Sequence, residues 1–389
     1  MPHIYGLDET GLNAAAVAAR IALDVARQHS ADVDERARFP NESLAALSKQ
    51  KLYGLCVSSE FGGMAQGPRS FAAVVEELAQ ACSSTAMVYV MHVTAAQAIA
   101  SSNTLKDRAE ILREIAAGRH LSTLAFSERG SRSQFWAPVS QLKSVADGFS
   151  ASAEKSWVTS ASIADSYVAS SQMPSAGSPL ESVVYLVRPK SAQGVKRGAS
   201  FNGLGLRGND SAPVTFEDIA ISRDELISPL GEGAKTMLEV VLPWFSIGTA
   251  AMAHGLCRAA IAATSAHLSQ AGFEHTGGKL RDLPNLRARL AEMSVRTEQS
   301  RALLGYTLGE MMQPCASTPL YVLQARLAAM QAASDVTDLA MKACGGAAFS
   351  RHLGIERLFR DARAGWVMAP TVDHLLDFVG KALTGLPLF

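Results

Sequence analysis

Two stretches of the chain carry most of the information about its fold. Residues 121–133 read LSTLAFSERGSRS, and residues 154–159 read EKSWVT. The first begins as an apolar strand and runs into a turn dense in small hydroxyl residues. The second is a strand in which Trp157 and Thr159 are two positions apart, so both are expected to point to one face of a sheet. An aromatic plate beside a hydroxyl, close to a loop of Ser and Gly, suits a flat ring system with polar edges, such as a flavin.

The composition indicates a large protein without an unusual charge balance. A chain of 389 residues, 48% of them hydrophobic, fits two or three packed domains. Because the formal net charge is zero, we expect neither a nucleic-acid partner nor a membrane partner. The first ten residues lack the pattern of a signal peptide, and the apolar stretch 85–100 is interrupted and too short for a membrane span. Five scattered cysteines without metal-site spacing predict buried, reduced thiols, and we expect a cytoplasmic protein.

Hydrophobic periodicity divides the chain into three parts. The pattern is helical at the start, changes to short strands punctuated by Gly, Ser, Asn and Asp, and then becomes helical again. We therefore predict a helical domain over residues 1–119, a β domain over 120–229 and a helical bundle over 230–389. The expected helices cover 12–28, a segment from 40, 70–102, 106–117, 235–269, 284–313, 318–343, a segment from 352 and one from 371; the clearest antiparallel strands are 182–187 and 212–221.

One motif has the spelling of a dinucleotide-binding turn. Residues 203–208 read GLGLRG, which fits the GxGxxG pattern. That motif requires a helix after the turn, so that the helix N-terminus meets the diphosphate. Here residues 212–216 are strand-like and contain a proline, so we do not predict a Rossmann fold.

Several further motifs complete a pattern that spans nearly the whole chain. They are EFGG at 60–63, EEL at 76–78, the GLGLRG turn followed by a strand ending in FED at 216–218, CGG at 344–346 and RDAR at 360–363. Together with the two opening stretches, they resemble the acyl-CoA dehydrogenase superfamily. The resemblance implies an α+β fold with an N-terminal helical domain, a central antiparallel β-barrel or sandwich and a C-terminal four-helix bundle. It also implies an enzyme, a flavin-dependent oxidoreductase with FAD as its cofactor.

The resemblance assigns cofactor contacts to residues of the two opening stretches. Phe126 and Ser127 would contact the pyrimidine edge of the flavin, and Ser133 would approach the diphosphate. Trp157 would pack on the isoalloxazine ring, and Thr159 would hydrogen-bond near its N5 atom. Taken singly, a Trp or a Thr on a strand is usually just a core or edge residue. The order and spacing of these residues together favour the flavin site.

Further contacts are implied in the C-terminal part. Gly345 and Gly346 match the glycine pair that lies near the FAD adenylate of a partner subunit, and Thr371 falls where the family places a Thr against the cofactor. Family members assemble as homodimers or homotetramers through these helices, so the resemblance implies such an assembly here.

The chain departs from the family where the catalytic carboxylate is expected. In the dehydrogenases this group removes the substrate α-proton as hydride leaves for the flavin. At the commoner position this chain has Ala369, and at the alternative position it has Trp244, followed by Phe245 in place of an Arg. None of these side chains accepts a proton. With His92, a polar residue on an otherwise apolar helix, they form the substrate pocket that we predict.

The residues with which the family contacts the FAD phosphates also differ here. The Arg and Phe that cross the dimer align with Phe273 and Thr276, and a following Gln aligns with Pro284. A small shift of the alignment would bring Arg281 into that role. In the Ser-rich turn, Arg132 replaces the usual Gly.

Three interpretations follow. The leading one is α,β-dehydrogenation of an acyl-CoA-type thioester with a non-standard base, and with an electron-transfer flavoprotein as the electron acceptor. Asp373 and His374 are the candidate bases, since they lie about one helical turn beyond Ala369; His92 is another, although a satisfied core histidine is its ordinary explanation. The alternative is a two-component monooxygenase that takes reduced flavin from a flavin reductase and acts with O2 on another small molecule. The third is a degenerate, non-catalytic flavin-binding paralogue.

Overall fold

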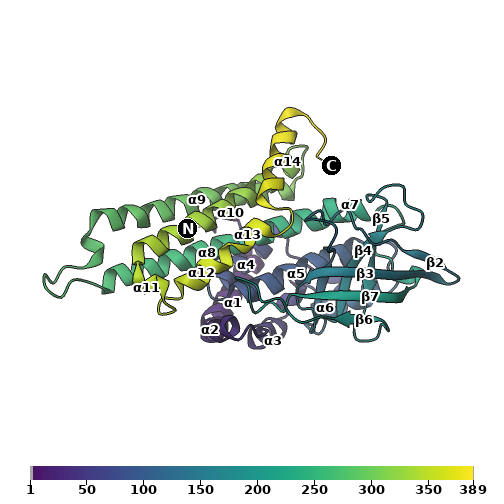
Figure 1. Ribbon diagram of the computed structural model, residues 1–389, viewed down its shortest axis with the longest axis horizontal. Helices are drawn as coiled ribbons and strands as arrows, with labels where there is room; N and C mark the ends of the chain where they lie inside the picture. The colour runs from purple at the N-terminus through teal and green to yellow at the C-terminus, as the bar shows by residue number, and fades with distance from the viewer. Residues whose placement is uncertain (1–2, 389) are drawn as a thin grey trace.

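The computed structural model describes residues 3–388, which form an elongated molecule. Long helices of the C-terminal part run along its length, and the strands gather at one end (Figure 1). The N-terminal helices lie between these parts, against both the bundle and the sheets. The predicted order of a helical, a β and a second helical part is thus present in the described residues.

The N-terminal part is helical as predicted, with one break that the sequence does not indicate. Its helices are α1 Glu9–Ile21, α2 Arg27–Glu35, α3 Asn41–Lys49, α4 Pro68–Ala79, α5 Ser83–Ser101 and α6 Arg108–Ala116. The continuous helix expected over 70–102 is two helices, because Cys82 adopts an extended conformation between α4 and α5. Helix α5 is buried almost all round, which explains why its apolar residues show no single stripe.

Seven strands form two sheets in the middle part. The three-stranded sheet has the order β1 (Ser122–Ala125), β4 (Ser166–Gln172), β5 (Ser182–Val187); the four-stranded sheet has the order β2 (Lys143–Val145), β3 (Gly148–Val158), β7 (Ala212–Ile221), β6 (Val195–Arg197). The bounds of β5 and β7 match the predicted strands. One pair departs from the predicted antiparallel arrangement: β1 and β4 are parallel. The chain passes through β2 and β3 of the other sheet between them, and such a crossover permits a parallel pair.

The three-stranded sheet has a helix on one face and the other sheet on its opposite face. Val168 and Val184 belong to the core that the sheet shares with α5. Tyr167 and Tyr185, one position away, belong to the core between the two sheets. All six residues of β5 are therefore buried, as expected for a strand covered on both faces.

The C-terminal part contains the three longest helices. Its elements are α7 Gly233–Thr236, α8 Leu242–Gln270, α9 Pro284–Met312, α10 Thr318–Cys344, α11 Gly346–Phe349, α12 Ile355–Ala362, α13 Ala364–Val367 and α14 Val372–Thr384. Helices α8, α9 and α10 pack side by side, α4 packs on α8, and α12 and α14 pack on α10. The stretch Gly233–Gln270 is apolar and long enough to cross a membrane, but 78% of its most apolar window is buried, as in a core helix. The five cysteines are unpaired, and Cys315 is exposed rather than buried.

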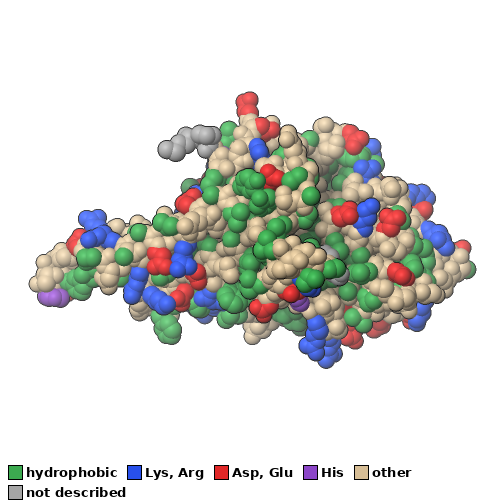
Figure 2. Space-filling view, turned by 90° about the horizontal axis from the view of Figure 1, so that it is seen from above, with side chains coloured by type: hydrophobic (Ala, Val, Ile, Leu, Met, Phe, Trp, Pro, Cys, Tyr) green, Lys and Arg blue, Asp and Glu red, His purple; other side chains and the backbone are tan. Residues whose placement is uncertain are grey.

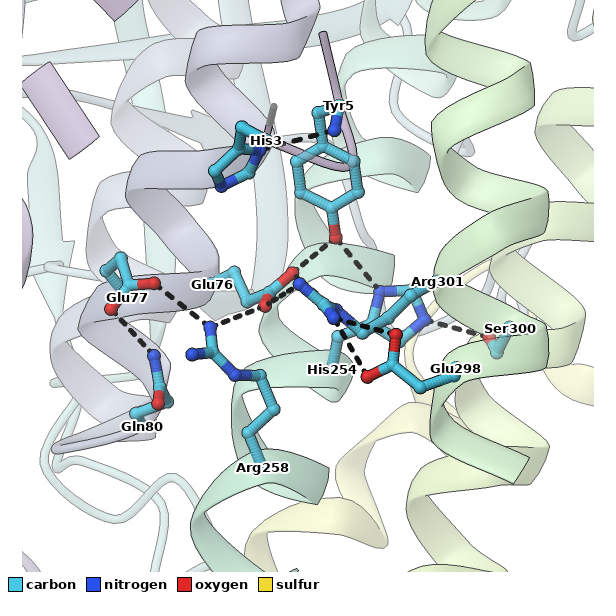
Figure 3. A network of polar contacts seen from close by, with 10 residues as sticks. All are labelled: His3, Tyr5, Glu76, Glu77, Gln80, His254, Arg258, Glu298, Ser300 and Arg301. Atoms are coloured by element: carbon cyan, nitrogen blue, oxygen red, sulfur yellow. Dashed lines mark hydrogen bonds and ion pairs between the residues drawn. The ribbon is translucent and has the colours of Figure 1, made fainter. Parts of the chain in front are cut away.

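A buried polar network ties the N-terminal segment to the bundle (Figure 3). The hydroxyl of Tyr5 donates to Glu76 of α4, and Glu76 accepts 2.7 Å from Arg258 of α8 and 2.9 Å from Arg301 of α9. Burial works to raise the pKa of Glu76, but Arg301 and the other neighbours outweigh it, so the pKa is lowered. His254 lies beside the same group, with Nδ1 3.4 Å from the Tyr5 hydroxyl. The Glu76 carboxylate therefore connects the N-terminal segment to two helices of the C-terminal part.

Replacing Glu76 by Gln is expected to lower the free energy of unfolding by about 3 kcal/mol, because two arginines lose their shared buried partner. Equilibrium urea unfolding measures this. The matched control is Glu298→Gln, since Glu298 is exposed and pairs with Arg301 alone; its expected cost is below about 1 kcal/mol. Equal losses in the two variants would contradict the central role of Glu76.

The pH dependence of stability should report His254. Burial lowers the pKa of His254 to about 4, so the imidazole is neutral in the fold. The unfolded chain takes up this proton below about pH 6.5, so the stabilisation present above that pH is lost as the pH falls toward 4, by up to about 1.4 kcal/mol per pH unit. Urea unfolding between pH 6.5 and 5 measures how the free energy of unfolding changes with pH. This change should be smaller for His254→Gln than for the unchanged chain. An identical slope would show that His254 does not titrate as its burial requires.

Candidate functional site

A cavity of about 470 Å³ lies where the three parts of the chain meet. Its walls come from α5, the loop after β1, the end of β3, the loop before β7, the start of α8 and the segment between α12 and α14. Of the predicted site residues, the cavity wall contains Phe126, Ser127, Ser133, Trp157, Thr159, Phe245 and Ala369. Residues more than 240 positions apart in the sequence thus meet at one place.

An ion pair fixes the loop after β1. Lys155 of β3 donates to Glu128 Oε1 at 2.6 Å, and both side chains are almost wholly buried. The other carboxylate oxygen of Glu128 accepts from the backbone N–H groups of Val139 and Ser140, at 2.6 and 2.8 Å. Burial works to raise the pKa of Glu128, but Lys155 and these donors hold it low. Glu128 lines the cavity, but both of its carboxylate oxygens already accept hydrogen bonds, so it is not a free base.

Trp157 and Thr159 reach the cavity in a way the sequence does not predict. Strand β3 ends at Val158, the backbone φ of Trp157 is +56°, and the register with β7 shifts between Lys155 and Val158. The simple alternation that places both side chains on one strand face is therefore wrong. Trp157 is 57% exposed and stacks on Phe201 with centroids 4.1 Å apart, whereas Thr159 is buried.

A buried arginine supports the wall that contains Ala369. Arg326 of α10 donates to the carbonyls of Met368 and Ala369 at 3.1 and 3.3 Å. Its guanidinium lies 4.8 Å from the ring centroid of Phe245, which also lines the cavity. Burial lowers the pKa of Arg326 to about 9. Sequence reasoning missed this residue, although a charge at a core-facing position of the 318–343 helix is a usable signal.

The candidate bases lie outside the cavity wall. Thr371 caps α14 by accepting from the His374 N–H at 3.3 Å, and its hydroxyl lies 3.2 Å from Nδ1 of His374. Asp373, in the first turn, is exposed. The ring of His374 packs edge-on against Trp136, with centroids 6.4 Å apart. The wall of the cavity includes none of Thr371, Asp373 and His374.

Two predicted pocket residues also lie elsewhere. His92 is fully buried: its Nδ1 accepts from the Ser122 N–H at 3.1 Å, so Nε2 carries the hydrogen that it donates to the Tyr53 carbonyl at 3.2 Å. Burial lowers its pKa to about 4. His92 is thus a satisfied, neutral core histidine. Trp244 packs on Phe71 instead, with centroids 5.5 Å apart.

The glycine pair lies at the far end of the bundle. Gly345 separates α10 from α11, which begins at Gly346, at the end of the molecule opposite the sheets (Figure 1). A Cβ atom added to either glycine would meet nothing within 4 Å. A single chain therefore does not bring them to its own cavity, and their predicted contact with a partner subunit's cofactor stays a prediction.

The charged groups of the cavity wall are one paired glutamate and three arginines. Arg207 is engaged by the Asp34 carbonyl and by Asn202, whereas Arg129 and Arg132 are exposed at the wall. Among the described residues that line the cavity, no carboxylate or imidazole is free to accept a proton. The site can bind and orient a flat ligand and attract an anion, but its wall supplies no general base.

Lys155→Met tests the ion pair behind the loop. The change leaves a buried carboxylate without its cation and should cost roughly 3–5 kcal/mol of unfolding free energy. Adding Glu128→Gln removes the orphaned charge, so the double variant should be more stable than Lys155→Met alone. Urea unfolding of the two variants gives the comparison. A double variant that is no more stable would show that the charge of Glu128 is not what Lys155 compensates.

Three family models match consecutive parts of the chain: the acyl-CoA dehydrogenase N-terminal domain over 9–119, the middle domain over 123–219 and the C-terminal domain over 231–384. The chain is 24% identical over 338 residues to the probable acyl-CoA dehydrogenase YngJ of Bacillus subtilis, covering 86% of this chain and 87% of the relative. Its fold is similar to butyryl-CoA dehydrogenase from Megasphaera elsdenii, with a TM-score of 0.91, 20% identity and coverage of 97% and 99%. It is also similar to the FAD complex of PigA, with a TM-score of 0.87, 19% identity and coverage of 97% and 98%.

Proposed function

The chain belongs to the acyl-CoA dehydrogenase family and is an FAD-dependent oxidoreductase, and we propose that it carries out α,β-dehydrogenation of an acyl-CoA-type thioester. The observation that carries the proposal is the cavity that joins the predicted flavin-contacting residues of the β domain to an apolar wall of α5 and α8. Curated relatives such as YngJ, matched over most of their length, support the same reaction class.

The residues of the cavity wall fit FAD. Trp157 offers a half-exposed indole, Ser127 and Thr159 offer hydroxyl groups, and Ser133 lies on the adjoining turn. FAD supplies the hydride acceptor of the reaction. Phe126 is buried and stacks on Phe135 with nearly parallel rings, so it adds an apolar surface to the wall.

The apolar part of the cavity suits the acyl chain. The wall includes Met87 and Met91 of α5, Val241 just before α8 and Phe245 of α8, and these side chains are all apolar. Flexible methionines accommodate hydrocarbon of varied shape. Arg326 holds the adjoining wall at Met368 and Ala369, so the acyl end meets a fixed surface rather than a mobile loop.

Monooxygenation is the second candidate, and one observation favours it. No described residue of the cavity wall is free to take the α-proton, and a positioned base contributes roughly 10²–10⁴-fold to such a reaction. A monooxygenase that receives reduced flavin from a reductase and uses O2 does not require that base. Under the dehydrogenase proposal, Asp373 or His374 remains the candidate acceptor, although neither lines the cavity.

Surface features support the proposed assembly. Around the projecting α14, hydrophobic side chains gather in the middle of one face (Figure 2). Exposed apolar residues of α13, α14 and the following segment are Trp366, Val367, Leu376, Leu383 and Leu386. Such a surface supports a homodimer or homotetramer. The unpaired cysteines, with Cys315 exposed, support a reducing, cytoplasmic location. We propose an electron-transfer flavoprotein as the electron acceptor.

An anaerobic absorption titration of the FAD-loaded protein with a panel of acyl-CoA thioesters tests the proposal. Bleaching of the oxidised flavin band by a panel member is the expected result. No bleaching by any panel member, together with transfer of an oxygen atom from O2 to a small-molecule product once a reductase supplies reduced flavin, would overturn dehydrogenation in favour of the monooxygenase.

The same titration tests the candidate base. In the double variant Asp373→Asn, His374→Ala, the bleaching rate should fall by about 10²-fold or more if either residue takes the α-proton. The matched control is Asp377→Asn, an exposed acid one turn further along α14. An unchanged rate in the double variant would exclude both residues.

A further inference from the structure

Two arginines at the cavity wall carry charge that the described residues do not neutralise. Arg129 and Arg132 both line the cavity and are exposed, and no carboxylate within residues 3–388 lies within 4 Å of either guanidinium. Arg207, the third arginine of the wall, differs: its Nε donates to the Asp34 carbonyl at 2.9 Å and lies 3.9 Å from the Asp34 carboxylate. The loop after β1 is therefore the cationic part of the site.

The backbone of this loop adds two free donors. Arg132 and Ser133 have φ values of +47° and +71°, so two successive residues adopt the left-handed conformation. The N–H groups of Ser131 and Gln134 close the turn onto Glu128 and Ser131, but those of Arg132 and Ser133 donate to no described residue. Successive N–H groups in such turns form anion-binding concavities.

Hydrogen bonds to Glu128 hold the strained turn in place. A left-handed non-glycine residue costs on the order of 1 kcal/mol and persists where its surroundings determine it. Here Glu128, at the start of the turn, is locked by Lys155 and by the N–H groups of Val139 and Ser140. The free donors and the two guanidinium groups are thus presented by a preorganised loop, which reduces the entropy lost on binding.

We propose that Arg129, Arg132 and the two free N–H groups bind the diphosphate of FAD, so that the chain neutralises the phosphates of its cofactor from its own loop. The proposal rests on the FAD-dependence stated above and not on the identity of the substrate. Its chemistry is the pairing of two guanidinium groups with a dianionic diphosphate. The cavity wall that contains them also contains Trp157 and Thr159, where the flavin ring is expected, so ring and diphosphate would lie in one continuous space.

The loop between α8 and α9 is the competing position. It lies at the end of the molecule opposite the sheets (Figure 1), and its Phe273 and Thr276 carry no charge. Arg281, in the same loop, is exposed. If phosphate neutralisation came from this loop of a partner subunit, Arg281 would be its cation.

Affinity for FAD, measured by flavin fluorescence on protein stripped of its cofactor, tests the proposal without any substrate. Arg129→Gln and Arg132→Gln should each raise the Kd for FAD about tenfold, and the double variant about 50-fold or more, because each removes a charge-assisted contact. Raising the salt concentration should weaken FAD binding less in the double variant than in the unchanged protein. Arg132→Lys, which keeps the charge, should retain most of the affinity.

Riboflavin, which has the ring but no phosphate, separates phosphate binding from damage to the site. Its Kd should not change in the double variant; an equal loss for riboflavin and FAD would overturn the proposal. The matched control is Arg20→Gln, an exposed arginine of α1 away from the cavity. An unchanged Kd for FAD in the double variant, or a larger loss in Arg281→Gln, would also overturn it. So would a rise confined to the KM of a phosphate-bearing CoA thioester, which would assign the arginines to the substrate.

Discussion

The ion pair between Glu128 and Lys155 is the constraint on which the cavity depends. It joins the loop after β1 to strand β3 inside the protein, with a separation of 2.6 Å. Every polar atom of the Glu128 carboxylate is used, by Lys155, by the hydroxyl of Ser140 and by two backbone N–H groups. A buried pair of this kind contributes specificity of geometry more than net stability. Here it fixes, from one side, the turn at Arg132 and Ser133 and, from the other, the strand end at Trp157.

Local patterns in the sequence were enough to predict most of the fold. The strands 182–187 and 212–221 and the long C-terminal helices have the bounds that periodicity gives, because each buries one well-defined face or is buried throughout. The break at Cys82 and the parallel pairing of β1 with β4 could not be read locally. Both depend on how distant segments pack, and neither leaves a signal in a short window of sequence.

The sequence predicts one part of the candidate site, the loop after β1, better than the rest, and the reason is physical. Residues of the loop after β1 reach the cavity as expected, because a motif in one loop stays together when it folds. Asp373, His374 and His92 are suggested only by closeness in sequence or by polarity, and the structure places none of them at the cavity wall. His92 is satisfied by two backbone groups, and α14 turns Asp373 to the solvent. Arg326 was overlooked because its partners are carbonyls 42 and 43 residues away.

The network around Glu76 has a consequence for the order in which the chain is made. Tyr5 and Glu76 emerge from the ribosome early, but the arginines that neutralise Glu76 follow 182 and 225 residues later. Until then the first helices expose an apolar face of α4 and an uncompensated carboxylate that belongs in the interior. Translation of this protein therefore passes through a long interval in which its N-terminal third cannot reach its final packing, the interval in which nascent chains depend on chaperones.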